Sequence, residues 1–122
     1  MVILDSNIII SASRPHNGFL QDYIENNPHV ISIISWIEIL GYTNITSEEQ
    51  KFLDEYFVNV TSIDLTDEIV EVAIMLRKTR KMTLGDSIIG ATALFNNLTL
   101  VTNNEKDFSW IEGLTIINPL TK

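Results

Sequence analysis

Apolar segments of two kinds alternate along the chain. Short continuous runs rich in Val, Ile and Leu have the pattern of strands that are buried on both faces of a sheet. These runs predict strands over residues 2–4, 30–34, 58–65, 98–101 and 114–117. Between them lie segments whose apolar residues recur at helical spacing, and these predict helices.

Threonines stand at the starts of three of the predicted helices. Thr46 is followed by Glu49 in a capping-box pattern, which predicts a helix that runs to about residue 56. Thr66 and Thr83 each precede a segment with helical periodicity, and the second of these segments predicts a helix over residues 84–95. Further helical segments are expected over residues 19–24, 35–42 and 104–110.

The alternation of strands and helices predicts the fold class. We expect an α/β sandwich in which a mainly parallel sheet is flanked by helices. The chain has 122 residues and is 45% hydrophobic, which is enough for a single domain, residues 1–122, with a core that needs no disulfides. In such sheets, ligands bind outside the carboxyl ends of the strands, where the strand order reverses. Candidate functional residues are therefore sought at the strand ends.

The charge of the chain bears on its partners. The formal net charge is −8, whereas a protein that binds nucleic acid non-specifically is more often basic. Carboxylates that bind a metal ion count as negative in this sum but are neutralised when the ion is present. Four of the eight Lys and Arg residues also form one run, Arg77, Lys78, Arg80 and Lys81. This run has two compatible interpretations, a helix C-terminus that complements the macrodipole and a positive lane for the backbone of a nucleic acid.

Several classes of protein are disfavoured by what the sequence lacks. The chain contains no Cys, which excludes a disulfide framework, a thiolate zinc site and a Cys nucleophile. Its five glycines are scattered, so there is no Gly-rich phosphate loop. The first apolar run is too short for a signal peptide, and no run approaches the roughly eighteen apolar residues of a membrane span. We expect a cytoplasmic protein without a membrane partner.

Acidic and amide side chains gather where the predicted strands end. These residues are Asp5, Glu38, Asp86, Asn103, Asn104 and Asp107. Most of them also have a structural explanation, because Asp5 and Asp86 can serve at helix N-termini and the asparagines suit a turn. Glu38 is harder to explain in this way, since it lies among isoleucines and an unpaired buried charge is costly.

Considered together, these side chains indicate a cation. Three carboxylates held within a few ångströms repel one another unless a positive ion joins them. Hard oxygen ligands suit Mg²⁺ or Mn²⁺, whereas His16 and His29 lack ligand-like spacing, which disfavours zinc. A divalent ion at such a site can activate water for attack on a phosphodiester, with Glu38 or Asp86 taking the proton.

Four segments of the chain resemble the motifs of PIN-domain proteins, in the family's order and over nearly the whole length. They are residues 2–7, a strand followed by Asp, Ser and Asn; residues 32–40, with Glu38 inside an apolar helix; residues 84–94, which begin Leu-Gly-Asp; and residues 100–108, with Asn104 and Asp107. The short chain is similar in length to the VapC-type toxins of bacterial toxin–antitoxin pairs.

The resemblance implies a magnesium-dependent endoribonuclease (Mn²⁺ being the alternative ion) whose acidic centre is Asp5, Glu38 and Asp86. Asp107 and the neutral Asn104 would complete the ligands. Because Asn104 carries an uncharged amide, the number of metal ions stays open. The resemblance also implies an RNA substrate, a cognate antitoxin and a homodimer.

Neighbouring polar residues are expected to support this centre. Ser6, Asn7 and Thr102 would hold the carboxylates in place. An apolar cluster on another predicted helix, Phe52, Leu53, Tyr56 and Phe57, is either a docking surface for a partner or, as helical spacing favours, part of the core.

Two other functions remain open at this stage. The chain could be a catalytically inactive PIN-like module that binds RNA or protein, although a complete set of acidic residues argues against that. It could also be a metal-dependent phosphatase, but Asn7 stands where one large phosphatase group has its second Asp.

Overall fold

A computed structural model describes residues 1–120 of the chain as a parallel sheet between two layers of helices. The sheet has five strands in the order β3-β2-β1-β4-β5. They are β1 (Val2–Leu4), β2 (His29–Ser32), β3 (Ser62–Ile63), β4 (Thr99–Val101) and β5 (Ile116–Ile117). Every pair of neighbouring strands is parallel, which confirms the predicted fold class.

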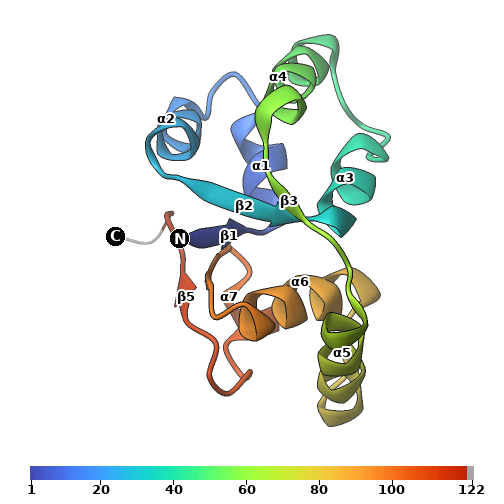
Figure 1. Ribbon diagram of the computed structural model, residues 1–122. Helices are drawn as coiled ribbons and strands as arrows, with labels where there is room; N and C mark the ends of the chain where they lie inside the picture. Colours follow the sequence, from blue (N-terminus) through green and yellow to red (C-terminus); the bar gives the residue numbers. More distant parts are fainter. Residues whose placement is uncertain (121–122) are drawn as a thin grey trace.

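Helices cover both faces of this sheet, as Figure 1 shows. On one face lie α1 (Ser6–Ala12), α2 (Gly18–Asn26), α3 (Ile33–Leu40) and α4 (Ser47–Asn59). On the other lie α5 (Asp67–Thr79), α6 (Leu84–Phe95) and the short α7 (Glu105–Phe108). Within the described residues, no helix is both long and apolar enough to cross a membrane.

Each layer of helices packs over its own hydrophobic core. In the central strand β1, Ile3 belongs to the core beneath α5, α6 and α7, whereas Leu4 belongs to the core beneath α1 to α4. Leu100 and Val101 of β4 divide between the two cores in the same way. Because successive strand residues point to opposite faces, a strand covered on both sides must be apolar throughout. This is why the short apolar runs of the sequence predict the strands.

The threonine caps occur where the sequence predicts them. Thr46 and Glu49 form a complete capping box at the start of α4. The side chain of Thr66 accepts a hydrogen bond from a backbone N–H of α5, and that of Thr83 does the same for α6. Helix α6 spans the predicted residues 84–95.

The largest differences from the sequence-based prediction are two shortened strands and one additional helix. The strand expected over residues 30–34 ends at Ser32, because the Ser32 side chain accepts a hydrogen bond from the Ile34 N–H and starts α3. Residues 58–59 continue α4, and the strand expected over residues 58–65 reduces to residues 62–63. Helix α1 was not among the predicted helices, although Asp5 suits a helix N-terminus.

The short helix α7 is held against α6 by one buried aromatic side chain. Phe108 is fully buried, and Gly90 of α6 leaves room for it and for Ile111. A Cβ atom on Gly90 would lie 3.2 Å from Ile111 Cδ1 and 3.7 Å from Phe108 Cδ1. The close approach of α7 to α6 therefore depends on the absence of a side chain at this position.

We predict that Phe108→Ala lowers the free energy of unfolding by roughly 3–5 kcal/mol, because it leaves a cavity in the core. The matched control is Phe95→Ala, since Phe95 lies on α6 with 51% of its surface exposed. The control should cost less than about 1 kcal/mol. Urea denaturation of the three proteins measures both effects, and equal losses would mean that Phe108 does not anchor α7.

Candidate metal centre

Asp5 lies at the point where the strand order reverses. The chain proceeds outward from β1 to β2 and β3, then returns to place β4 on the other side of β1. Asp5 follows β1 directly, and its side chain is only 3% exposed. It occupies the N-cap position of α1, yet its carboxylate makes no capping hydrogen bond. It accepts instead a 2.8 Å hydrogen bond from the Thr102 hydroxyl at the end of β4.

The Thr102 hydroxyl connects Asp5 to the segment that leads into α7. Its O–H donates to Asp5 Oδ2, and its oxygen accepts a 3.0 Å hydrogen bond from the backbone N–H of Asn104. Thr102 is itself fully buried. The position of the Asp5 carboxylate is therefore fixed from the neighbouring strand as well as from its own.

Glu38 reaches the same edge of the sheet from α3. The Ser6 hydroxyl donates a 2.7 Å hydrogen bond to Glu38 Oε1. The same hydroxyl lies 2.8 Å from that of the fully buried Ser35, so Ser35 can donate to Ser6 while Ser6 donates to Glu38. Two serines from different helices thus orient this carboxylate.

Gly85 provides the space into which the other carboxylate oxygen of Glu38 fits. A Cβ atom built on Gly85 would lie 2.2 Å from Glu38 Oε2 and 3.1 Å from Glu38 Cδ. Two heavy atoms without a bond between them cannot approach so closely. Any residue other than glycine at the start of α6 would therefore displace the carboxylate of Glu38.

Asp86 and Asp107 come from the opposite layer of helices. Asp86 lies in the first turn of α6, where its backbone N–H donates a 3.1 Å hydrogen bond to the capping Thr83 side chain. Asp107 is an exposed residue of α7. The two side chains line one pocket with a volume of about 430 Å³.

Burial and neighbouring negative charges raise the pKa values of two of these acids, Asp5 and Asp86. Burial raises the pKa of Asp5 to about 6, the Thr102 hydrogen bond opposes this rise, and the charges of Asp86 and Glu38 add to it. Burial also raises the pKa of Asp86, and the charges of Asp107 and Glu38 raise it further. Glu38 and Asp86 therefore lie close enough to Asp5 at this edge for their charges to disfavour its ionised form.

The donor atoms suit a hard divalent cation, although they do not form a closed cage. Carboxylate oxygens are the ligands that Mg²⁺ and Mn²⁺ prefer, and a positive ion would relieve the repulsion between them. Within residues 1–120, no three His, Asp or Glu side chains lie close enough together to enclose an ion. Mg²⁺ commonly binds through one or two carboxylates and keeps several waters, which is compatible with this open arrangement.

Among the amide and hydroxyl residues around the acids, some hydrogen-bond to a carboxylate and others do not. Ser6 and Thr102 bond to carboxylates, whereas the side chain of Asn7 is exposed and makes no hydrogen bond within the described part of the chain. Asn104 begins α7 without capping it through its side chain. The amide oxygen of Asn103 is buried and has no hydrogen-bond donor among the described residues.

Two positioning features of this centre were not found from the sequence. Ser35 is an ordinary polar residue in an apolar segment, and no pattern links it to Ser6. The role of Gly85 was also missed, although the glycine directly before Asp86 was the available signal.

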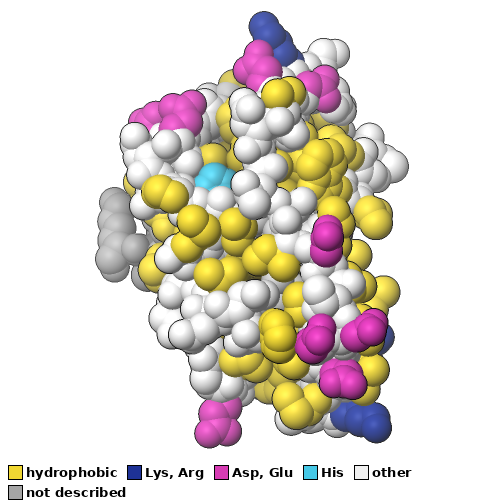
Figure 2. Space-filling model, in the orientation of Figure 1, with side chains coloured by type: hydrophobic (Ala, Val, Ile, Leu, Met, Phe, Trp, Pro, Cys, Tyr) yellow, Lys and Arg dark blue, Asp and Glu magenta, His cyan; other side chains and the backbone are white. Residues whose placement is uncertain are grey.

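The structure separates the basic run into two parts. Arg77 and Lys78 are exposed in the last turn of α5, where cations complement the helix macrodipole. Figure 2 shows basic side chains over this end of the molecule, with acidic ones nearby. Arg80 and Lys81 lie beyond the helix and line the pocket that contains Asp86 and Asp107.

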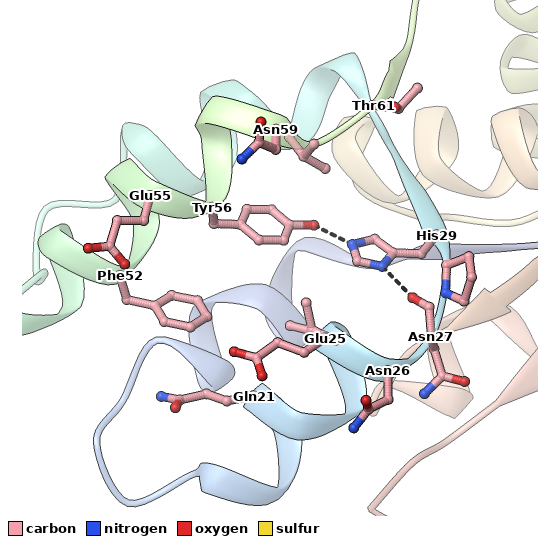
Figure 3. Close-up of a pocket in the computed structure, with 13 residues that line it drawn as sticks. Gln21, Glu25, Asn26, Asn27, His29, Phe52, Glu55, Tyr56, Asn59 and Thr61 are labelled. Carbon is pink, nitrogen blue, oxygen red and sulfur yellow. Dashed lines mark hydrogen bonds between the residues drawn. The ribbon is translucent and has the colours of Figure 1, made fainter.

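A larger pocket, with a volume of about 910 Å³, lies between α2 and α4 at the opposite edge of the sheet (Figure 3). It contains His29, the first residue of β2, whose Nε2 lies 2.8 Å from the Tyr56 hydroxyl and whose Nδ1 lies 2.8 Å from the Asn27 carbonyl oxygen. Burial raises the pKa of the Tyr56 phenol, which stays protonated and donates to His29. Both ring nitrogens are thus engaged, and we do not place the chemistry there.

The apolar cluster on α4 divides between the core and this pocket. Leu53 and Phe57 are buried in the core beneath α1 to α4, as helical spacing favoured. Phe52 and Tyr56 are partly buried and line the pocket, where their rings stack with centroids 6.4 Å apart.

Comparison with known structures finds the same fold in toxin–antitoxin complexes. A chain of a toxin–antitoxin complex from Klebsiella pneumoniae is 30% identical, with 98% of each chain covered and a TM-score of 0.78. A chain of VapBC2 from Rickettsia felis, bound to a DNA fragment from its promoter, is 27% identical, with 97% of this chain and 98% of that chain covered and a TM-score of 0.80.

A more distant match shows likeness of fold alone. A chain of DNA-bound VapBC from Salmonella typhimurium is 20% identical, with 98% of this chain and 99% of that chain covered and a TM-score of 0.79. Comparison with curated proteins by sequence gives no match.

The family model supports the resemblance of the four motifs. The model of the PIN domain matches residues 2–114, which include Asp5, Glu38, Asp86 and Asp107. The chain therefore belongs to the PIN-domain family.

Proposed function

We propose that this chain is a magnesium-dependent endoribonuclease and the VapC-type toxin of a toxin–antitoxin pair. The observation that carries the proposal is the state of Asp5. Asp5 is 3% exposed, its carboxylate does not cap the helix, and burial together with the charges of Asp86 and Glu38 disfavours its ionised form. A structural role does not require this arrangement, whereas a cation site does.

In the proposed mechanism, a bound divalent ion would polarise the attacked phosphate and activate a water molecule. Asp5 and Glu38 would hold that ion, the first fixed by Thr102 and the second by Ser6. Asn104 and Asp107 would contribute further oxygen donors, directly or through water.

Asp86 is the side chain best placed to take a proton from the attacking water. It lines a pocket open to solvent, and burial together with the charge of Asp107 raises its pKa above the ordinary value for Asp. A raised pKa makes a carboxylate a stronger base. A side-chain hydrogen bond with Thr83 opposes the rise for Asp86, and the carboxylate of Glu38 accepts a hydrogen bond from Ser6.

The two other functions considered from the sequence are less well supported. An inactive binding module would have no need to keep Asp5, Glu38 and Asp86 mutually repelling. A phosphatase of the group considered needs a carboxylate at position 7, where the exposed amide of Asn7 stands.

We also propose that the toxin pairs with an antitoxin protein and with a second copy of itself. The similar chains from K. pneumoniae and R. felis come from toxin–antitoxin complexes. Large apolar side chains are exposed on the two helices at the right of Figure 1: Ile37 of α3 is 71% exposed, and Ile74 and Met75 of α5 are 51% and 55% exposed. Such exposure favours burial against another chain.

If this face forms the homodimer, Ile37→Asp should convert a dimer to a monomer, because the substitution places a charge in an apolar contact. Phe19→Asp is the control, since Phe19 is 61% exposed on α2, which lies at the left of Figure 1, away from α3 and α5. Light scattering after size exclusion measures the mass of each protein, alone and co-expressed with the product of the adjacent gene. A monomeric parent that captures no neighbouring protein would contradict both proposals.

The Asp5→Asn variant should lose activity and gain stability. Cleavage of RNA in Mg²⁺ should fall by more than about 100-fold, beyond the usual cost of losing an outer-sphere partner. The pKa of Asp5 is raised in the folded protein to about 6, so the folded state binds the proton more tightly than the unfolded state does. The parent therefore loses stability as the pH rises from about 4 to about 6, by up to about 3 kcal/mol.

The variant lacks this loss because its amide does not ionise. In chelator at pH 8 it should be more stable than the parent by about 1–3 kcal/mol, and the difference should shrink toward pH 4. Denaturation at both pH values and a cleavage assay with and without chelator test the prediction. Parental cleavage rates in chelator would contradict the mechanism, and a less stable variant at pH 8 would contradict the account of Asp5.

Gly85→Ala should separate the position of Glu38 from the stability of the fold. The new methyl group would displace the Glu38 carboxylate, so cleavage should fall by about 10- to 100-fold. Stability should stay level or rise by up to about 1 kcal/mol, because alanine favours a helix over glycine. Kinetics and thermal denaturation of the same preparation measure the two effects.

Gly18→Ala is the matched control, because Gly18 also begins a helix and a Cβ atom there meets nothing within 4 Å. It should leave the rate unchanged. Glu38→Asp should reduce activity less when Gly85→Ala is already present, since a shorter side chain avoids the methyl group. Additive losses would mean that Gly85 does not act through Glu38.

A further inference from the structure

Three basic side chains and two acidic ones share the pocket between the start of α6 and α7. Arg80, Lys81 and Lys106 line it together with Asp86 and Asp107. Its volume of about 430 Å³ lies within the range of roughly 300–1,000 Å³ that is typical of sites for small ligands. Half of the eight Lys and Arg residues lie in the run that ends at this pocket, in a chain with a formal net charge of −8.

The basic side chains of the pocket are not neutralised by their acidic neighbours. Within residues 1–120, the single ion pair joins Arg14 to Glu49 at 3.6 Å, on the other layer of the molecule. Arg80, Lys81 and Lys106 thus have no carboxylate oxygen within 4.0 Å among the described residues. Opposite charges that face one pocket without touching leave room for an anion on the cations and a metal ion on the carboxylates.

Arg80 is held in this position by an aromatic side chain. Its guanidinium carbon lies 5.7 Å from the centroid of the Trp110 ring, within the range of a cation–π interaction. The Trp110 indole N–H donates a 3.0 Å hydrogen bond to the carbonyl oxygen of Asp107. The buried Phe108 anchors the same segment, so Arg80 is oriented from α7 and does not depend on its own helix alone.

We propose that Arg80, Lys81 and Lys106 form a subsite that binds a backbone phosphate adjacent to the phosphodiester being cleaved, and that Trp110 positions Arg80 within it. This inference rests on the proposed nuclease function, and it adds Lys106 and Trp110 to the substrate-binding surface. A phosphate group matches the three cations because its several oxygens can accept from all of them at once. The contacts would read the backbone and not the bases, so they would orient the polynucleotide across Asp86 without selecting its sequence.

The test measures the binding of a short, fluorescein-labelled single-stranded RNA by anisotropy over a range of salt concentrations. A Glu38→Gln background with Mg²⁺ keeps the RNA intact without changing the pocket, which Glu38 does not line. Lys106→Ala and Arg80→Ala should each weaken binding by roughly three- to tenfold and reduce the salt slope by about 0.7, the value for one phosphate contact on a single strand. Lys51→Ala, which removes a Lys from the distant α4, should change neither quantity.

The role of Trp110 is tested by coupling. Trp110→Leu should weaken binding in the parent but have little further effect when Arg80→Ala is present, because it acts through Arg80. Trp110→Phe keeps an aromatic face and should restore most of the affinity, which guards against a loss due to misfolding. If Trp110→Leu weakens binding equally in both backgrounds, Trp110 contacts the RNA itself and the positioning role is wrong.

Steady-state cleavage by proteins that retain Glu38 separates this inference from the proposed function. Lys106→Ala should raise KM with little change in kcat, since its contact is made away from the reacting atoms. If the parent cleaves RNA but Lys106→Ala changes neither KM nor the salt slope, the subsite is wrong and the nuclease function stands. If the salt slopes change as expected but the parent does not cleave, the subsite stands and the nuclease function is wrong. An RNA that fails to bind the parent at any salt concentration overturns the subsite.

Discussion

The burial of one carboxylate, with like charges near it, is the constraint to which much of this structure responds. Asp5 is almost entirely removed from water, and burial and the charges of Glu38 and Asp86 together raise its pKa to about 6. The fold must compensate for this cost at neutral pH. The Thr102 hydrogen bond does so locally, and the two apolar cores on either side of the sheet do so globally. The acidic centre can persist because strands buried on both faces supply the remaining stability.

The parallel sheet explains why acids from distant parts of the sequence meet at all. Asp5 follows β1, Glu38 lies in the helix after β2, and Asp86 begins a helix of the other layer. Since all strands run in one direction, their carboxyl ends share an edge, and the reversal of strand order between β1 and β4 opens that edge. The details are then set by small groups: a serine hydroxyl orients Glu38, and the missing side chain of Gly85 gives it room.

The sequence predicted best what depends on neighbouring residues. Thr83 and the apolar periodicity after it placed α6 at its observed bounds, because capping and amphipathicity are local signals. The isoleucines at positions 33–34 were misleading, since β-branched residues favour strands while tertiary packing here places them in a helix. Within the site, residue types indicated the acids, but the contact of Gly85 with Glu38 joins positions far apart in the chain. No spacing rule encodes such a contact, because it exists only once α3 and α6 have packed.

The distribution of charge would reconcile an acidic chain with the polyanionic substrate that we propose. A phosphate responds to the local electrostatic field. Around Asp86 this field comes from carboxylates and from three cations that have no ion-pair partner within residues 1–120. A cation bound to the carboxylates would remove the negative part of that field and so favour phosphate on Arg80, Lys81 and Lys106. By reciprocity, a phosphate bound there would favour the cation to the same extent. Metal and substrate would therefore assist each other's binding, and the repulsion stored among the acids would be relieved when both are present.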